Sequence, residues 1–239
     1  MNCVDSNWAV ACDFDGTISI GDATDAFLAA YASDQWRAVE DLWVRGKIGS
    51  RECLARQLGC VRASRADMNE LADSIEIDPA FASFTEFCAA HGVPLAVISD
   101  GLEPIIARVL ACHDLAHLPV FANNMQLSCG NRWRLAARHG RAGCQSGTCK
   151  CAVMEGLRGA EPGRRLLFVG DGRSDFCAAR QACDLVAAKS KLLCHMQSLV
   201  LPVIEYQSFA DLSGIVAGLL EGGNGQSLAK IRSNFHACA

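Results

Sequence analysis

The sequence predicts an α/β fold in which a doubly wound parallel sheet carries a small helical insertion after its first strand. Two observations predict this fold. Short, continuously apolar runs alternate with segments whose apolar residues recur at helical spacing, as in a parallel sheet covered by helices on both faces. Several of the apolar runs are followed at once by small and acidic residues, and in such sheets functional groups collect at the carboxyl ends of the strands.

The predicted strands are short and mostly buried. The first begins at Trp8 and is continuous rather than alternating, which is typical of a strand buried on both faces. The segment 125–136 alternates weakly about Gly130 and Asn131 and predicts a hairpin. The other strands are apolar runs bounded by turn-forming residues, and with the first they are 8–14, 93–99, 119–122, 165–169, 185–188 and 203–206.

Helical spacing is most regular between residues 21 and 78, directly after the first strand. Ser64 or Ser50 is suited to cap a helix N-terminus there. The helices predicted in this insertion are 25–31, 35–44, 50–58 and 65–75. Those predicted beyond it are 81–91, 103–112, 149–157, 176–181 and 209–219. We therefore predict a core formed by 1–19 and 80–222, a helical cap formed by 20–79, and a polar tail at 223–239.

Composition excludes several classes of protein. A hydrophobic fraction of 51% with 20% charged residues is ample for a packed core. The net charge of -4 argues against a general nucleic-acid binder, which needs a basic face. No apolar run approaches the ~18 residues of a membrane span, and the N-terminus lacks the basic and apolar regions of a signal peptide. We expect a cytoplasmic protein that binds neither nucleic acid nor membrane.

The chain has 14 cysteines, which is a high count. Most lie singly in apolar surroundings, where Cys acts as a small hydrophobe, and without a secretory signal a disulfide framework is not expected. Cys144, Cys149 and Cys151, with Cys129 farther off, form a cluster. Their spacings differ from the paired C-x2-C knuckles of structural zinc sites. We expect reduced thiols, with a zinc site as the alternative.

The stretch 10–17 carries the strongest chemical signal. Asp13 and Asp15 lie two residues apart at the end of the first strand, so both side chains can project from the carboxyl edge of the sheet. Two neighbouring carboxylates repel unless a cation lies between them. Oxygen ligands favour Mg2+, which usually takes the rest of its shell from a substrate phosphate. The alternative is a strand that ends in a solvated Asp-x-Asp-Gly turn.

Other segments supply the remaining parts of a phosphate site. Ser99 and Gly101 follow the second strand, Lys150 opens a helix, and Asp171 and Asp175 follow a later strand. A phosphate site needs a cation, hydroxyl and N–H donors, and carboxylates that hold a magnesium ion. Each residue alone has an ordinary structural explanation, but their order and type together indicate phosphoryl chemistry.

These motifs resemble those of phosphatases in the haloacid dehalogenase-like (HAD) superfamily. The superfamily's D-x-D-G-T motif matches 13–17, its strand-end Ser or Thr matches Ser99, its isolated Lys matches Lys150, and its G-D-G-x-x-D motif matches 170–175. The resemblance implies a HAD-like, Rossmannoid core with a cap and the activity of a phosphoric monoester hydrolase.

The resemblance also implies a role for each matched residue. Asp13 would be the nucleophile that forms an aspartyl-phosphate. Asp15 would be the general acid and then the general base, and its presence marks phosphate-ester hydrolysis because dehalogenases of the superfamily lack it. Ser99, Gly101 and Lys150 would bind phosphoryl oxygens.

The cofactor that the resemblance implies is Mg2+. Its ligands would be Asp13, the backbone carbonyl of Asp15, and Asp171, while Asp175 would orient that shell. The implied partner is a small phosphorylated metabolite that the cap encloses.

The insertion resembles the small cap of a subgroup that includes phosphoserine phosphatases and a methionine-salvage phosphatase acting on 2-hydroxy-3-keto-5-methylthiopentenyl 1-phosphate. The stretches 98–101, 147–150 and 170–175 are more similar to the methionine-salvage enzymes. We therefore expect a methionine-salvage-like phosphatase. A phosphoserine phosphatase-like activity and a phosphate-binding protein without catalysis are the alternatives.

Three positions bear on that choice. Asp22 matches the acid that contacts the serine amine in phosphoserine phosphatases, so Asp22 and Arg56 are candidate substrate contacts. The arginine that grips the serine carboxylate in those enzymes falls on Gln57, with Arg56 beside it. Asp100 stands where these relatives mostly have Gly, and a carboxylate there should either turn away from the phosphate pocket or pair with a cation such as Arg173.

Overall fold

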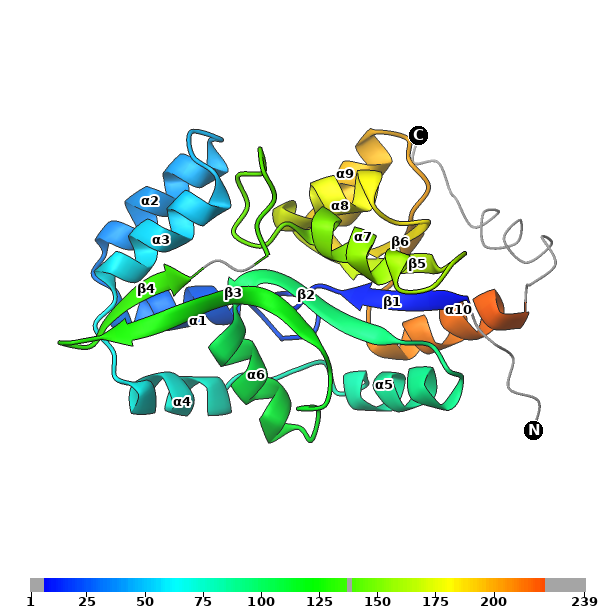
Figure 1. The fold of residues 1–239 in the computed structure, drawn as a ribbon, viewed down its shortest axis with the longest axis horizontal. Helices are drawn as coiled ribbons and strands as arrows, with labels where there is room; N and C mark the ends of the chain where they lie inside the picture. Colours follow the sequence, from blue (N-terminus) through cyan, green and yellow to red (C-terminus); the bar gives the residue numbers. More distant parts are fainter. Residues whose placement is uncertain (1–6, 137–138, 222–239) are drawn as a thin grey trace.

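A seven-stranded sheet forms the centre of the molecule (Figure 1). The computed structural model describes residues 7–136 and 139–221. The strands are β1 (Trp8–Cys12), β2 (Leu95–Leu102), β3 (Val120–Ser128), β4 (Arg132–Ala136), β5 (Arg165–Gly170), β6 (Leu185–Ala188) and β7 (Ile204–Glu205). Their order is β4-β3-β2-β1-β5-β6-β7, and every pairing is parallel except that of β3 with β4. Because the sheet grows outward from β1 in both directions, it is doubly wound, and the predicted fold class is confirmed.

Alternate residues of β1 face two different apolar cores. Val10 and Cys12 belong to one core, and Ala9 and Ala11 belong to the other. All five residues of β1 are buried. This double burial explains why the strand is continuously apolar in sequence rather than alternating.

The helices form a layer on each face of the sheet (Figure 1). One layer contains α7 (Lys150–Gly159), α8 (Phe176–Gln181) and α9 (Ser190–Ser198), and the other contains α5 (Phe81–Ala90), α6 (Glu103–Cys112) and α10 (Phe209–Glu221). In the second layer, the ring of Phe209 lies 4.7 Å from that of Phe81 and 5.3 Å from that of Phe84, which joins α10 to α5. No helix in the described part of the chain is long and apolar enough to cross a membrane.

Four short helices lie between β1 and α5, namely α1 (Ala23–Tyr31), α2 (Gln35–Val44), α3 (Ser50–Cys60) and α4 (Arg65–Asp73). The two segments that connect these helices to the core lie side by side: Ile20 N donates to Glu76 O and Asp78 N donates to Ile18 O, both at 2.8 Å. The α2–α3 pair extends over the edge strand β4, whereas α1 and α4 pack against α6 (Figure 1). A division into domains at residues 20 and 79 stays a prediction.

The two serines predicted as N-caps have different partners. Ser64 caps α4 in a capping box: its hydroxyl accepts from Asp67 N at 3.2 Å, and Asp67 accepts from Ser64 N at 2.7 Å. Gly49, not Ser50, occupies the N-cap position of α3, and no side chain caps that helix. The Ser50 hydroxyl instead donates to the carboxylate of Asp100.

Beyond shifts of one or two residues at element ends, the structure differs from the predicted elements mainly in three places. β2 continues to Leu102, so Ser99 lies within the strand rather than at its end. β3 runs unbroken and joins the predicted strand 119–122 to the first arm of the predicted hairpin. Helix α9 was not predicted, because its buried residues are Leu192 and Met196 and so short an apolar stripe is hard to distinguish in sequence. The predicted tail, 223–239, lies outside the described residues.

Candidate active site

Asp13 and Asp15 follow β1 at the carboxyl edge of the sheet. The backbone N–H of Asp13 donates to Val169 O at 2.8 Å, which extends the pairing of β1 with β5. The chain then turns at Gly16, whose φ of +71° is in the left-handed region. A Cβ at this position would lie 2.6 Å from Asp171 Oδ2. Only glycine therefore allows the turn to approach Asp171 this closely.

Lys150 joins two of the predicted carboxylates. Its Nζ lies 2.6 Å from Asp13 Oδ1, 2.5 Å from Asp175 Oδ1 and 3.4 Å from Ser174 Oγ. The lysine is only 4% exposed. Burial alone would lower the pKa of Lys150, but Asp13 and Asp175 more than offset this effect and hold the pKa above the usual lysine value. The site therefore contains a buried ammonium group.

The loop after β5 fixes the orientation of Asp175. Its Oδ2 accepts from the backbone N–H groups of Asp171 at 3.1 Å and Gly172 at 2.9 Å, while its Oδ1 faces Lys150. Asp171 has a different partner, because its Oδ1 accepts from Thr17 Oγ1 at 3.2 Å. Both oxygens of Asp175 are thus engaged by the protein, which fits a residue that orients its neighbours.

Three carboxylates form a group that could hold a metal ion. One oxygen from each of Asp13, Asp171 and Asp175 lies within 4.8 Å of the others, and among residues 7–136 and 139–221 no other such group of His, Cys, Asp or Glu is present. Burial raises the pKa of Asp13; Asp175 adds to this rise and Lys150 opposes it. Burial and then Asp175 likewise raise the pKa of Asp171. An oxygen-only donor set with excess negative charge suits Mg2+, so the residues present fit that ion.

Asp15 is held by the first residues of α1. Its Oδ1 accepts from Ala23 N at 2.8 Å, and Thr24 Oγ1 lies 3.5 Å from its Oδ2. Burial, followed by the charges of Asp22 and Asp13, raises the pKa of the Asp15 carboxyl well above its usual value. A raised pKa favours the protonated acid, which is the form that can donate a proton.

Ser99 and Gly101 lie beside Asp15. Ser99 is 1% exposed, and its Oγ accepts from Gly101 N at 2.9 Å. A Cβ on Gly101 would overlap Asp15 Oδ2 and would lie 3.0 Å from Thr24 Oγ1. The glycine therefore gives the backbone of β2 close access to the carboxylate that follows β1.

Asp100 turns toward neutral donors. Its Oδ1 accepts from Thr148 N at 2.8 Å and from Asn123 Nδ2 at 3.0 Å, and its Oδ2 accepts from the Ser50 hydroxyl. The sequence left two alternatives open for Asp100, and the pairing with Arg173 is not among its contacts in the described residues, where Arg173 is exposed. Hydrogen bonds, rather than a cation, thus satisfy this carboxylate.

Of the insertion residues considered in the sequence, Arg56 and Gln57 are engaged elsewhere, whereas Asp22 lies close enough to Asp15 for its charge to raise the pKa of that carboxyl. Asp22 is exposed and caps α1, since its Oδ1 accepts from Asp25 N at 2.8 Å. Arg56 pairs with Glu52 one turn earlier in α3, and both side chains are about half exposed. Gln57 is buried, and its Nε2 donates to Glu40 Oε2 at 2.8 Å, which joins α3 to α2. The structure does not bring Arg56 or Gln57 into the group around Asp13.

The cysteine cluster does not assemble as a metal site. Cys149 and Cys151 are buried in the apolar core under α7, and Cys144 packs against the same core. Cys151 Sγ lies 3.6 Å from Cys177 Sγ on α8, a pairing that the spacing did not suggest. Cys129 lies exposed between β3 and β4, outside this group.

Sequence reasoning missed two polar residues near the candidate site. Lys189 follows β6 at the same edge of the sheet, where its Nζ lies 3.4 Å from Thr17 O and its charge opposes the raised pKa of Asp171. The strand-end argument that selected Asp171 would also have selected this lysine. Asn123 is buried within β3, and no local signal marks it, because its partner Asp100 belongs to another strand.

Comparisons with known proteins agree with this geometry. The profile of a family described as putative phosphatases matches residues 8–210. A 2-hydroxy-3-keto-5-methylthiopentenyl-1-phosphate phosphatase from Brevibacillus brevis is 30% identical over 213 residues, which cover 86% of this chain and 93% of the relative.

Two solved structures share the fold. A HAD family hydrolase from Salmonella enterica subsp. enterica serovar Typhi has a TM-score of 0.68 at 19% identity, covering 92% of this chain and 72% of the other. A phosphoserine phosphatase described as a phospho-aspartyl intermediate analogue has a TM-score of 0.65 at 17% identity, covering 87% of this chain and 97% of the other.

Proposed function

The chain belongs to the putative phosphatase family of the HAD superfamily, and from that premise we propose that it is a Mg2+-dependent phosphomonoesterase acting through an aspartyl-phosphate on Asp13. That it is a phosphoric monoester hydrolase follows from its family. The observation that carries the finer proposal is the convergence of the Asp13 carboxylate, the Lys150 ammonium group and Asp171 at one edge of the sheet.

In the first step, the Asp13 carboxylate attacks phosphorus. A bond forms between a carboxylate oxygen and phosphorus as the bond from phosphorus to the leaving oxygen breaks. Asp15 gives that oxygen its proton, a role supported by its raised pKa and by its place two residues after Asp13. In the second step, Asp15 takes a proton from water, the water oxygen bonds to phosphorus, and the Asp13 carboxylate is released.

Positive groups and hydroxyls would hold the phosphoryl oxygens during both steps. Lys150 is a buried ammonium group, and Ser99 and the backbone at Gly101 lie beside Asp15. Asp13, Asp171 and the backbone carbonyl of Asp15 would hold Mg2+, with Asp175 orienting the loop that carries Asp171. When bound, the ion neutralises charge on the transferring phosphoryl group and fixes its orientation.

We further propose that the substrate is a small phosphorylated metabolite, with the methionine-salvage ester of the Brevibacillus brevis relative as the first candidate. The insertion supports this choice over phosphoserine. A phosphoserine site needs a cation for the carboxylate, and at the expected position Gln57 is buried against Glu40 while the neighbouring Arg56 pairs with Glu52.

The test is phosphate release from a panel containing this ester, phosphoserine and a generic aryl phosphate, with Mg2+ or with EDTA. Asp13→Asn is compared with Asp34→Asn, since Asp34 is exposed and its side chain makes no capping hydrogen bond. We expect Mg2+-dependent release that Asp13→Asn abolishes and Asp34→Asn leaves unchanged. Failure of the wild type on every ester, the aryl phosphate included, would instead support phosphate binding without catalysis.

A further inference from the structure

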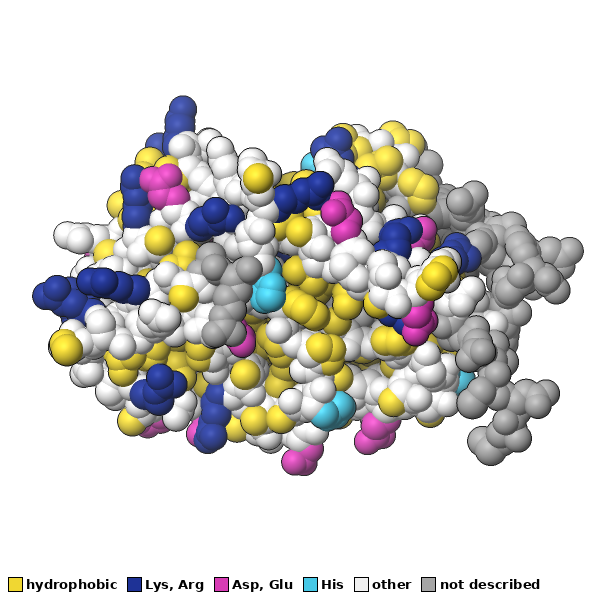
Figure 2. Space-filling view, viewed as in Figure 1, with side chains coloured by type: hydrophobic (Ala, Val, Ile, Leu, Met, Phe, Trp, Pro, Cys, Tyr) yellow, Lys and Arg dark blue, Asp and Glu magenta, His cyan; other side chains and the backbone are white. Residues whose placement is uncertain are grey.

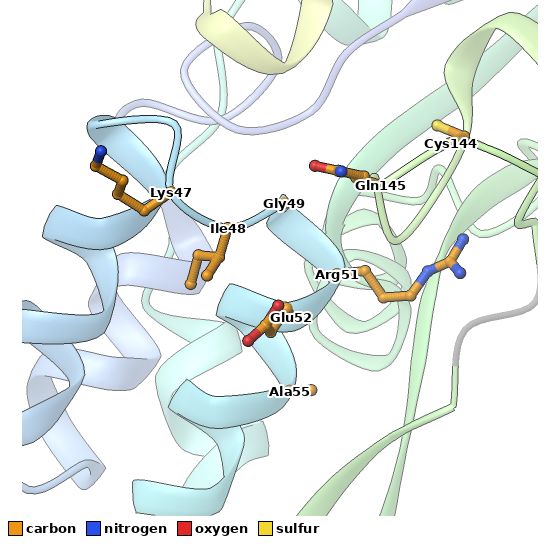
Figure 3. Close-up of a pocket in the computed structure, with 8 residues that line it drawn as sticks. All are labelled: Lys47, Ile48, Gly49, Arg51, Glu52, Ala55, Cys144 and Gln145. Carbon is orange, nitrogen blue, oxygen red and sulfur yellow. The ribbon is translucent and has the colours of Figure 1, made fainter.

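The first turn of α3 lies directly on the loop that precedes Lys150. Arg51 N donates to Gln145 O at 3.1 Å, and Arg51 Nε donates to Ser146 O at 3.1 Å. Gly49 approaches Gln145 so closely that an added Cβ would overlap both its side chain and its backbone. Figure 3 shows Gly49 at the start of the helix and Arg51 in its first turn, with Gln145 and Cys144 on the facing loop. The insertion therefore contacts the core at the loop that leads to Lys150.

Asp100 is bonded to both sides of this contact and joins three elements of the fold. It accepts from the Ser50 hydroxyl on α3, from Thr148 N in the loop at 2.8 Å, and from Asn123 Nδ2 on β3 at 3.0 Å. The same Asn123 nitrogen donates to the backbone carbonyl of Asp100 at 2.7 Å. No other side chain in the described part of the chain is shown to bond α3, β3 and the loop at once.

The neighbours of this junction are the proposed phosphate-binding residues. Asp100 lies between Ser99 and Gly101 in β2, and Thr148 precedes Lys150 by two residues. A carboxylate so near a phosphate pocket repels an anionic substrate, and its repulsion is greater where burial lowers the effective dielectric constant. Because the Asp100 carboxylate repels the substrate, we expect it to have a function that offsets this repulsion.

We propose that Asp100 is a positioning residue: its bond to Ser50 holds α3 against the loop, and its bonds to Thr148 and Asn123 set the loop so that Lys150 and Ser99 meet the phosphoryl group. This inference rests on the proposed function. In this proposal, Ser50 connects the insertion to the core, and Asp100 couples that connection to the phosphate-binding residues.

The first test compares Ser50→Ala with Ser74→Ala. The Ser74 hydroxyl, at the C-cap of α4, donates to Leu71 O in the last turn of that helix. Ser50→Ala removes the bond to α3 and leaves the loop bonds of Asp100 in place. We expect KM for the preferred ester to rise about tenfold, with kcat changed less than about threefold, since hydrogen bonds to charged groups have that magnitude. Ser50→Thr keeps a hydroxyl and should restore KM.

The second test compares Asp100→Ala with Asp100→Asn. The alanine variant loses all three donors, so kcat and KM should both worsen, with kcat/KM falling more than tenfold. The asparagine oxygen can still accept from Thr148 N and Asn123, while its amide can donate to the Ser50 oxygen, so this variant should keep most of the activity. Rescue by asparagine separates hydrogen-bonded positioning from an effect of charge.

A third measurement does not depend on activity. Hydrogen exchange of the Arg51 and Thr148 amides should accelerate in Asp100→Ala, and that of Arg51 should accelerate in Ser50→Ala, but neither should change in Ser74→Ala. The proposal would be overturned if Ser50→Ala, Asp100→Ala and Ser74→Ala showed equal exchange rates and equal kinetics. If Asp100→Ala fails to fold, the comparison of Ser50→Ala with Ser74→Ala still decides it. If the wild type hydrolyses no ester, the proposed function fails while the exchange data still decide whether Asp100 holds the helix and the loop.

Discussion

Charged side chains at the carboxyl edge of the sheet differ from those on the α2–α3 pair. At the sheet edge, Lys150 and Asp175 are 4% and 0% exposed, and each has several partners. On α3, Arg56 and Glu52 form a pair within one helix whose side chains are about half exposed. Figure 2 shows Lys and Arg side chains on the surface of both halves of the molecule, on either side of a notch in its upper edge. A buried charged group is stable only when an opposite charge or hydrogen bonds compensate it, whereas an exposed ion pair contributes about 0–1 kcal/mol to the free energy of unfolding.

The largest expected effect concerns the acid at the sheet edge. Asp15→Asn removes the proposed proton donor and should lower kcat by about 10²–10⁴-fold with an ester whose leaving group needs protonation. The loss should be much smaller with an aryl phosphate, whose leaving group departs without a proton. Steady-state kinetics on both esters measure this difference, and Asp41→Asn on the exposed face of α2 is the control. An equal loss on both esters would contradict the acid role.

Lys150 should have the next largest effect, and on stability as well as rate. Lys150→Met leaves Asp13 and Asp175 buried without their cation, which should lower the free energy of unfolding by about 3–5 kcal/mol and slow turnover, though less than Asp15→Asn does. Urea denaturation in EDTA measures the stability. Lys191→Met, at an exposed position, should change it little. Equal free energies of unfolding for the two variants would show that Lys150 does not stabilise the buried charges of Asp13 and Asp175.

A smaller effect is expected where the insertion meets the core outside the site. Asp73 of α4 accepts from Arg108 of α6 at 2.5 and 2.8 Å, and this bond, with a further one from Cys112, lowers the pKa of Asp73 to about 2. The folded pKa is depressed, so the stabilisation is present above the ordinary value of 3.8 and is lost as pH falls toward 2. Urea midpoints of wild type and Asp73→Asn should therefore differ at neutral pH and converge in acid. A constant difference across that range would refute the ion pair as its cause.

The smallest effect is expected at Arg56. Because its pair with Glu52 is half exposed and within one helix, Arg56→Ala should change the free energy of unfolding by less than about 1 kcal/mol. It should also leave KM for every ester on the panel within about twofold, since the structure keeps this side chain away from Asp13. A large rise in KM for phosphoserine alone would show that Arg56 reaches the substrate and would favour the phosphoserine alternative.

Burial also explains how much of the fold the sequence could predict. The strand at Trp8 and the motif that begins at Asp13 were predictable because burial on two faces and strand-end chemistry leave local patterns. The fold class followed from the alternation of such strands with helices. The ends of β2 and the whole of α9 were not predictable, because their limits depend on neighbours that are distant in sequence.

The grouping of side chains in the candidate site was predictable to the same extent. Asp171 belongs to a short motif and Lys150 matches an isolated lysine of the superfamily, and the structure brings both to the group around Asp13. Two partners of Asp100, Ser50 and Thr148, are 50 and 48 residues away, so the sequence left open whether this carboxylate turns away from the pocket or pairs with a cation and did not identify its neutral donors. Spacing alone does not specify such long-range hydrogen bonds.

The central claim is that phosphoryl transfer passes through Asp13. The most direct measurement is an acid quench of the enzyme during turnover of its preferred ester with Mg2+, followed by peptide mapping by mass spectrometry. We predict one phosphoryl group on the peptide that contains Asp13, assigned to Asp13 rather than Asp15 by fragmentation, and none in Asp13→Asn. A turning-over enzyme that carries no phosphoryl group at any quench time, or a phosphorylated and active Asp13→Asn variant, would contradict the account.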